Sequence, residues 1–358
     1  MGVPVSGEFR VEPLSEAEFE EWARLVESSP HGTIYSHPRY LEVLCSAAGG
    51  RFVVLGARRG DELAGGVALY ENDSVFGRYV APRLLLYYNG PVLRPYGTRY
   101  PSEQTARHLK ALSALESAIG LRRYAGVTLV CMPSFTDARP FLTAGWSARL
   151  RYTYLVDIAE PLAQWGRVEQ NLRRLIRRCE HEGVVCVDDD DFDAFYTLHE
   201  RTMTRKGGEA YLWPGRFRRY FEALRREKLC RLFHARQPDG RTIASQLVLL
   251  GPGRLCHVVA AAADEAFLQS GASAFLRWKA FEALSASGYK TADLTDASLN
   301  SVTHFKSQLG GDLRMLLVLN GPQSLPYRLE AAAKALAWQA RATLRRAARR
   351  VGRRGESS

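Results

Sequence analysis

Residues 192–200 of this 358-residue chain read Phe192-Asp-Ala-Phe195-Tyr-Thr-Leu198-His-Glu200, and they repeat the earlier stretch Phe19-Glu-Glu-Trp22-Ala-Arg-Leu25-Val-Glu27. Other segments recur in the same order, at an offset of about 164 to 180 residues. Solenoid repeats recur at about 20–50 residues, so a period of this length indicates that a whole domain was duplicated.

Three further pairs of segments support the duplication. Each pair combines the same residue types with the same strand or turn signals, and each keeps its place in the order. The pairs are Pro38-Arg39-Tyr40 with Pro214-Gly-Arg216-Phe217, the hairpin 53–69 with the hairpin 232–249, and the strand 128–130 before Phe141 and Gly145 with the strand 292–294 before Phe305 and Gly310.

Each copy is predicted to run helix, helix, β-hairpin, strand, helix, strand, helix, strand. Within this order we expect a strand at 84–88, a helical bridge at 162–181 and closing strands at 152–156 and 314–319. Strands mixed with helices at this spacing favour an α/β fold, with a mixed sheet and helices packed on its faces. Helix boundaries are expected at a capping box that begins at Ser15 and at the acidic run 188–191.

The chain length and composition favour two globular domains, at 1–157 and 158–327, followed by a tail at 328–358. The net charge is +11, and the tail supplies +7 of it through nine Lys or Arg and two Glu. A basic amphipathic helix is predicted there, which suits an anionic membrane surface or tRNA, and a disordered basic end is the alternative. Its apolar stripe would comprise Leu329, Ala333, Leu336, Ala340 and Leu344.

The six cysteines form no C-x-x-C pair and no zinc-type spacing with histidine, so no metal site is expected. No apolar run reaches the roughly 18 residues of a membrane span. Reduced thiols and the absence of a signal-like apolar segment favour a cytoplasmic protein, peripheral at the inner face of the membrane if the tail binds lipid.

Several short motifs in fixed order, from about residue 19 to residue 319, resemble the FemAB family of tandem acyltransferases of the Gcn5-related N-acetyltransferase (GNAT) fold. The resemblance also extends to relatives called BioF2-like acetyltransferases. The motifs are Tyr154-Leu-Val-Asp157, Arg173-Arg174-Leu-Ile-Arg177-Arg178, Met203-Thr-Arg205-Lys206-Gly207, Ile243-Ala-Ser245, Ser270-Gly271-Ala-Ser273 and His304-Phe305-Lys306 with Gly310-Gly311.

The resemblance implies two tandem GNAT-like domains, with the acceptor on the side of the first and the donor on the side of the second. It implies an acyltransferase that moves an acyl group from acyl-CoA to an amine of a cell-envelope sugar or peptide precursor. No tightly bound cofactor is implied. An aminoacyl-tRNA donor is the first alternative, and a non-catalytic protein that binds a precursor or a membrane is the second.

A donor-binding loop is expected at Ser270, Gly271 and Ser273, because the exposed N–H groups of a helix N-terminus favour phosphate oxygens. This loop could hold a coenzyme A pyrophosphate or a tRNA backbone. It departs from the GNAT pattern at Leu268, where the family has Arg or Gln, and at Ser273, where it has Gly or Ala.

Catalytic residues are predicted where the two copies differ. The resemblance implies that Lys306 stabilises the transferred carbonyl, and acids at a strand end can accept the amine proton. The second copy has polar groups where the first has apolar ones: Lys306 for Leu142, Asp293 for Leu129 and Asp296 for Met132.

The remaining candidates are substrate-binding residues. Tyr87 and Tyr88 lie in the turn that the resemblance places at the acceptor, and His257 precedes the donor loop. Four arginines share one helix face and suit phosphate contacts: Arg173, Arg174, Arg177 and Arg178. The predicted set is Tyr87, Tyr88, Arg174, Arg178, Arg205 and His257.

Overall fold

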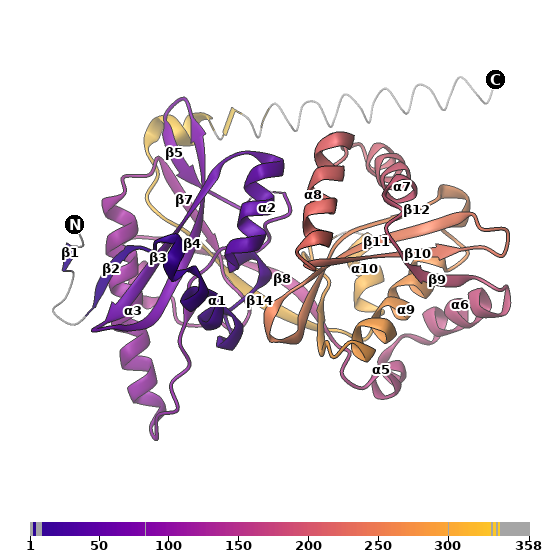
Figure 1. Cartoon of the computed structure of the whole chain (residues 1–358), viewed down its shortest axis with the longest axis horizontal. Helices are drawn as coiled ribbons and strands as arrows, with labels where there is room; N and C mark the ends of the chain where they lie inside the picture. Colours follow the sequence, from indigo (N-terminus) through magenta and orange to yellow (C-terminus); the bar gives the residue numbers. More distant parts are fainter. Residues whose placement is uncertain are drawn as a thin grey trace.

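A computed structural model describes residues 3–4, 9–82, 84–299, 301–330, 332, 333 and 336. Two lobes lie side by side, and strands β8 and β14 run between them (Figure 1). Each lobe contains strands of a twisted sheet and helices packed against it. The helical bridge is two helices because Val168 is extended and Glu169 N–H donates to the carbonyl of Gln308 at 2.9 Å.

The first lobe contains the first copy of the repeated order, preceded by two short strands. Its helix α1 follows a 3₁₀ turn, and Ser15 N–H donates to the carboxylate of Glu18 at 2.9 Å, as the capping box predicts. Its elements are β1 Val3–Pro4, β2 Arg10–Pro13, α1 Phe19–Ser28, α2 Pro38–Ala48, β3 Arg51–Arg59, β4 Glu62–Ser74, β5 Gly77–Val80, β6 Val92–Leu93, α3 Pro101–Leu121, β7 Gly126–Val130, α4 Arg139–Thr143 and β8 Ser147–Asp157.

The second lobe repeats that order after the helical bridge. Asp191 is the N-cap of α7, and its carboxylate accepts from Ala194 N–H at 3.0 Å, as the acidic run predicts. The elements are α5 Pro161–Arg167, α6 Gln170–His181, β9 Val185–Asp188, α7 Phe192–Arg205, α8 Pro214–Arg226, β10 Cys230–Arg236, β11 Thr242–Leu250, β12 Leu255–Ala263, α9 Ala272–Ala286, β13 Thr291–Asp293, α10 Ser301–Ser307 and β14 Asp312–Asn320.

The closing strands of the two copies are exchanged. Strand β8 of the first copy pairs antiparallel with β13 of the second, and β14 of the second copy pairs antiparallel with β7 of the first. The two closing strands also pair with each other along their whole lengths, from Asp312 opposite Leu155 to Asn320 opposite Ser147. The prediction that each copy is closed by its own last strand is therefore wrong.

This exchange joins all the described strands into one sheet with the order β1-β2-β3-β4-β5-β7-β14-β8-β13-β12-β11-β10-β9, and β6 pairs with β4. Parallel pairs occur at equivalent places, between β5 and β7 and between β12 and β13. The boundary at residue 157 divides the chain after β8 and stays a prediction, since backbone hydrogen bonds cross it.

The repeated helices α2 and α8 pack against each other across the two lobes. Tyr40 on α2 and Tyr220 on α8 are fully buried, and their hydroxyl oxygens lie 3.0 Å apart. Trp22 and Phe195, which occupy equivalent positions in the repeat, belong to the same apolar core. Burial of such large side chains contributes about 1.5–3 kcal/mol each, so the two lobes stabilise one another.

Residues 84–88 do not form the predicted strand. Leu85 has a φ of 66°, and the segment crosses the end of the sheet as a turn. The side chain of Asn89 replaces a strand partner, because it accepts from Val130 N–H at 2.7 Å and donates to the carbonyl of Thr128 at 3.0 Å. This crossing carries Tyr87 and Tyr88 from the first lobe toward the second.

Residues 325–330 of the segment after β14 are helical. The predicted amphipathic tail helix falls almost entirely on residues outside those that the structure describes, including Ala340 and Leu344. No helix in the described ranges is long and apolar enough to cross a membrane.

Candidate functional site

Strands β12 and β13 begin as parallel neighbours and then separate. Their pairing ends at His257 opposite Asp293, while β12 continues along β11 as far as Ala263. A bulge between Val258 and Ala260 bends β12 at the point of separation. A cleft of about 700 Å³ opens there, lined by Tyr87, Arg151, Lys206, Tyr211, Val258, Val259, Ala261, Arg277, Leu294, Thr295, Asp296, Val302, Thr303 and Lys306.

Helix α10 places the ammonium of Lys306 at the end of β13. Its Nζ donates to the carbonyl of Asp296 at 2.7 Å and to the carbonyl of Thr295. Thr295 and Asp296 have φ values of 45° and 53°, which are rare for residues with a Cβ and turn both carbonyls toward one cation. An ammonium has three N–H donors, so one donor of Lys306 remains for a ligand in the cleft.

Burial, followed by the charge of Arg277, lowers the pKa of Lys306 to about 8. Lys306 is therefore mostly protonated near neutral pH and loses its proton at a lower pH than an exposed lysine does. A cationic donor in a partly dry cleft can stabilise a developing oxyanion, as the sequence predicts for this residue.

Asp296 lies on the opposite side of the same turn and lines the cleft with its carboxylate. Arg151 Nη2 lies 3.4 Å from Oδ1, and the hydroxyl of Ser298 is 2.8 Å from Oδ1 and 2.9 Å from Oδ2. No other carboxylate lines this cleft among the described residues. Asp296 is thus placed to accept a proton from a bound amine.

Asp293 is fully buried behind the wall of the cleft. Its carboxylate accepts from Tyr88 Oη at 2.7 Å, Thr153 Oγ1 at 2.5 Å and Thr295 N–H at 2.8 Å, and His257 Nδ1 lies 3.0 Å away. Burial alone would raise the pKa of Asp293, but these hydrogen bonds, with that of His257 first, hold it below its usual range.

This network joins both copies, because Tyr88 and Thr153 come from the first and Asp293, His257 and Thr295 from the second. Asp293 and His257 are fully buried and do not line the cleft, so neither is placed to contact a substrate there, contrary to the prediction. Asp293 instead accepts from Thr295 N–H, and the Thr295 carbonyl binds Lys306, while His257 lies against Asp293. Tyr88 has the same indirect position, whereas Tyr87 lines the cleft and its hydroxyl donates to the carbonyl of Val259 at 3.3 Å.

Arg277 and Lys206 also line the cleft, and neither is among the predicted site residues. Arg277 is 6% exposed, its Nε and Nη1 are buried with no hydrogen-bond partner among the described residues, and burial lowers its pKa to about 10. Burial lowers the pKa of Lys206 as well. Lys206 lies in the motif at residues 203–207 that carries the family resemblance, and that motif was the available signal for it.

The loop before α9 packs against α6. A Cβ on Gly271, which has a φ of 95°, would lie 2.6 Å from Cβ of Leu175, so only glycine fits this approach. Ser270 Oγ accepts from Ala272 N–H at 3.2 Å, and Arg178 Nη2 donates to the carbonyl of Ser270 at 2.6 Å. Arg178 therefore binds the predicted donor loop itself, and Ser273 lies half-buried in the first turn of the helix.

Arg174 and Arg205 lie outside the Lys306 cleft. Arg174 borders an open hollow of about 540 Å³ on α6, together with Arg173 and Arg177. Arg205 borders another hollow, of about 550 Å³, with Asp264 and Glu265. The structure thus brings together Lys306, Asp296 and Tyr87 in the cleft. Asp293, Tyr88 and His257 lie behind its wall. The predicted Arg174, Arg178 and Arg205 do not line it.

No group of three or more His, Cys, Asp or Glu that could hold a metal ion occurs within the part of the chain that the structure describes. The described cysteines are free thiols, and burial raises the pKa of Cys131, Cys256 and Cys230.

Comparisons with known proteins identify the type of domain and the fold. Residues 166–307 match the family model of the acetyltransferase (GNAT) domain, which includes the cleft strands and Lys306. No curated protein sequence matches the chain.

Solved structures share the fold at low sequence identity. FemX is 12% identical with a TM-score of 0.65, covering 86% of this chain and 96% of its own. L-PGS from Bacillus licheniformis is 12% identical with a TM-score of 0.57, covering 90% and 97%. A tandem GNAT protein from the clavulanic acid biosynthesis pathway is 14% identical with a TM-score of 0.52, covering 88% and 100%.

The predicted α/β fold with two tandem GNAT-like units is thereby confirmed. At these identities the solved structures establish the fold, and the family model establishes the type of domain. The chain therefore contains a GNAT acyltransferase domain at residues 166–307, and as a whole it shares the fold of FemX and of the tandem GNAT protein.

Proposed function

We propose that the cleft between β12 and β13 transfers an acyl group from acyl-CoA to an amine of a cell-envelope sugar or peptide precursor. The observation that carries this proposal is the Lys306 ammonium, held by two carbonyls at the point where the strands part. In this step the amine nitrogen attacks the thioester carbon, a C–N bond forms, the C–S bond breaks and the thiol leaves.

Lys306 and Asp296 have complementary roles in that step. The remaining N–H of Lys306 donates to the oxygen that becomes negative in the tetrahedral intermediate. Asp296 accepts the proton that the attacking amine loses, and the released thiolate is protonated from solvent. Lys306 and Asp296 line the same cleft, so one arrangement of bound amine and thioester can contact both side chains.

The charge of the cleft favours an anionic substrate. Arg151, Lys206, Arg277 and Lys306 line it, against the carboxylate of Asp296 alone in the described part of the wall. Guanidinium groups bind phosphate and carboxylate oxygens through paired N–H donors, and Arg277 has two buried nitrogens without a partner. A phosphate-linked envelope precursor has this chemistry.

An aminoacyl-tRNA donor is the second candidate, and the packing of α6 favours it. Gly271 lies against Leu175, and Ser270 takes the amide of Ala272, so part of the helix N-terminus that would bind a pyrophosphate is occupied. Arg173, Arg174 and Arg177 lie together on α6, as a phosphate backbone requires. The tRNA would then supply an ester in place of the thioester.

The donor is identified by a direct comparison. Purified protein is incubated with acyl-CoA and a panel of amino sugars and amino-acid amides, and free thiol is followed. Amine-dependent thiol release is the expected result. If no acyl-CoA is consumed and aminoacyl-tRNA is deacylated in the presence of the amines, the second candidate replaces the first. If neither donor is consumed, the chain is a binding protein.

A basic-face variant separates the two donors further. We expect Arg173→Glu with Arg174→Glu and Arg177→Glu to leave acyl-CoA turnover within about twofold, because these residues lie outside the cleft. If tRNA is the donor, the same variant should weaken its binding and flatten the dependence on salt concentration. The matched control reverses three exposed arginines on α8, at Arg216, Arg219 and Arg226.

The pH dependence of kcat reports on the charge of Lys306. The oxyanion-stabilising ammonium is present below a pKa of about 8 and is lost above it, so kcat should fall as the pH rises through about 8. Replacement by arginine, which stays protonated, should move this fall to a much higher pH. A wild-type kcat that keeps rising through pH 9 contradicts the assigned role.

A further inference from the structure

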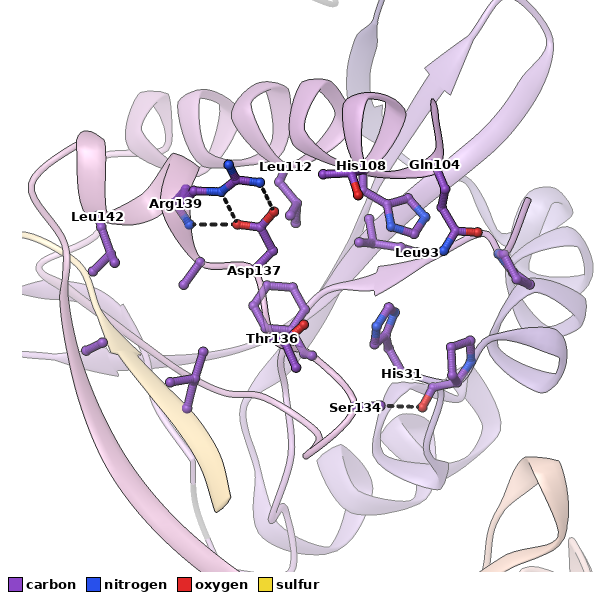
Figure 2. A pocket seen from close by; sticks show the side chains of 17 residues that line it. His31, Leu93, Gln104, His108, Leu112, Ser134, Thr136, Asp137, Arg139 and Leu142 are labelled. Atoms are coloured by element: carbon purple, nitrogen blue, oxygen red, sulfur yellow. Dashed lines mark hydrogen bonds and ion pairs between the residues drawn. The ribbon is translucent and has the colours of Figure 1, made fainter. Parts of the chain in front are cut away.

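The first lobe contains a second cavity, of about 750 Å³, at the place equivalent to the Lys306 cleft. It lies beyond β7, as the Lys306 cleft lies beyond β13, and Leu142 borders it where Lys306 borders the other. Figure 2 shows side chains from α3 on one side and His31 on the other pointing into this space. The cavity is of the size that binds small ligands.

The wall of this cavity carries no uncompensated charge among the described residues. Asp137 and Arg139 are its only oppositely charged side chains, and they pair through Nε to Oδ1 at 2.9 Å and Nη2 to Oδ2 at 2.7 Å. Burial, followed by His108, lowers the pKa of His31 to about 4, so His31 is neutral near pH 7. The Lys306 cleft has four cationic side chains, and this cavity therefore selects a different, uncharged ligand.

Two polar groups on α3 form a donor and an acceptor one helical turn apart. His108 Nε2 lies 2.8 Å from the carbonyl of Arg94, which can only accept, so Nε2 carries a proton and, in this imidazole tautomer, Nδ1 is the acceptor. The Gln104 Oε1 accepts from Tyr96 N–H at 3.1 Å, which leaves the Nε2 amide group of Gln104 as a donor. Residues four apart share a helix face, and the side chains of Gln104 and His108 both point into the cavity in Figure 2.

An apolar surface leads away from this pair. Leu112 follows His108 by one turn, and Leu142 lies farther along the cavity in Figure 2. Leu317 borders the cavity and pairs with Leu150, while Met315 lies two residues farther along the same face. Leu142, Leu150 and Met315 are 47%, 53% and 51% exposed, so apolar side chains continue from the cavity onto the surface.

We propose that this first-lobe cavity binds an uncharged secondary amide that carries a hydrocarbon chain. The ligand N–H would donate to Nδ1 of His108, and the ligand carbonyl would accept from Nε2 of Gln104. The chain would run over Leu112 toward Leu142 and Leu317. A second ligand of this class would then bind the first lobe while the Lys306 cleft holds its own anionic substrate.

The test compares two probes that differ by one hydrogen-bond donor. N-octylacetamide and N-methyl-N-octylacetamide are titrated into the full chain by calorimetry. We expect the secondary amide to bind at least tenfold more tightly, because the tertiary amide leaves Nδ1 of His108 unpaired. His108→Phe should reduce the secondary amide to the affinity of the tertiary one, and His108→Asn, which keeps an oxygen near the position of Nδ1, should retain most of the preference.

Two further variants locate the bound amide. Leu142→Glu introduces a charge at a half-exposed position and should weaken both probes, whereas Lys306→Ala in the other cleft should change neither. Thermal melting shows whether each variant is folded, and Leu142→Glu keeps the test available if His108→Phe is not. Equal affinity for the two probes, no binding up to their solubility, or loss of binding in Lys306→Ala overturns the proposal.

Discussion

Lys306→Ala is expected to lower kcat/KM by about 10²–10³, which is the effect of removing one oxyanion donor. The ammonium is held by the carbonyls of Thr295 and Asp296, so alanine removes the cation together with its two hydrogen bonds to the turn. Most of the loss should appear in kcat, because the oxyanion exists only in the transition state. The measurement is steady-state transfer with the donor identified by the comparison above.

Lys279→Ala is the matched control for that variant. Lys279 lies on α9 and pairs with Glu180 at 2.8 Å and Glu282 at 2.9 Å, outside the cleft. Its loss should leave kcat/KM within about twofold, as expected for an exposed ion pair. If Lys306→Ala keeps wild-type activity, or raises KM alone, then Lys306 does not stabilise the transition state and the proposed mechanism is wrong.

Asp293→Ala is expected to destabilise the protein by about 3–5 kcal/mol, the cost of removing one partner from a buried ionic network. The variant leaves donors from Tyr88, Thr153 and Thr295 without an acceptor. Because these residues come from both copies, the loss affects the contact between the lobes as well as the cleft. Urea unfolding followed by circular dichroism measures the change.

The same carboxylate gives stability a defined pH dependence. The folded-state pKa of Asp293 lies below its unfolded value of about 3.9, so its contribution is fully present above that value and is lost as the pH falls through the folded pKa. Asp293→Asn should therefore remove part of the acid sensitivity below pH about 4.

Asp239→Asn is a matched control for the Asp293 variants. Asp239 lies in the exposed hairpin turn, where its Oδ1 accepts from Arg241 N–H at 2.9 Å, a bond that asparagine can also make. This change should alter stability by less than about 0.5 kcal/mol. Equal losses for Asp293→Asn and Asp239→Asn would mean that the buried network does not stabilise the fold.

The comparison between the two copies of the repeat pointed, from the sequence alone, to the neighbourhood of the proposed site. Leu129 and Asp293 are both fully buried, so the repeat correctly indicated a core position that became polar in the second copy. Leu142 and Lys306 each border a cavity. The sequence could not show that these cavities differ in charge, because Arg151, Lys206 and Arg277 reach the cleft from three separate segments.

Some local predictions failed because a distant contact overrode them. The 162–181 segment has a continuous helical pattern, but the carbonyl of Gln308 captures Glu169 N–H and divides it into two helices. The 84–88 segment has strand-forming residues, but the side chain of Asn89 makes the hydrogen bonds to β7 that the backbone of a neighbouring strand would make. The bonding partners, Gln308 for Glu169 and Val130 for Asn89, are distant in the sequence, so a local sequence window does not contain them.

The sequence by itself determined the duplication, the order of helices and strands, and the position of Lys306, because each depends on residues close together in the chain. Periodicity, capping residues and repeated spacing carry that information. Only the tertiary structure decided the exchange of β8 and β14, because a strand edge offers the same backbone donors and acceptors to either copy. Packing across the lobes selects between those partners, and the resulting exchange unites Tyr88 and Thr153 of one copy with Asp293 of the other.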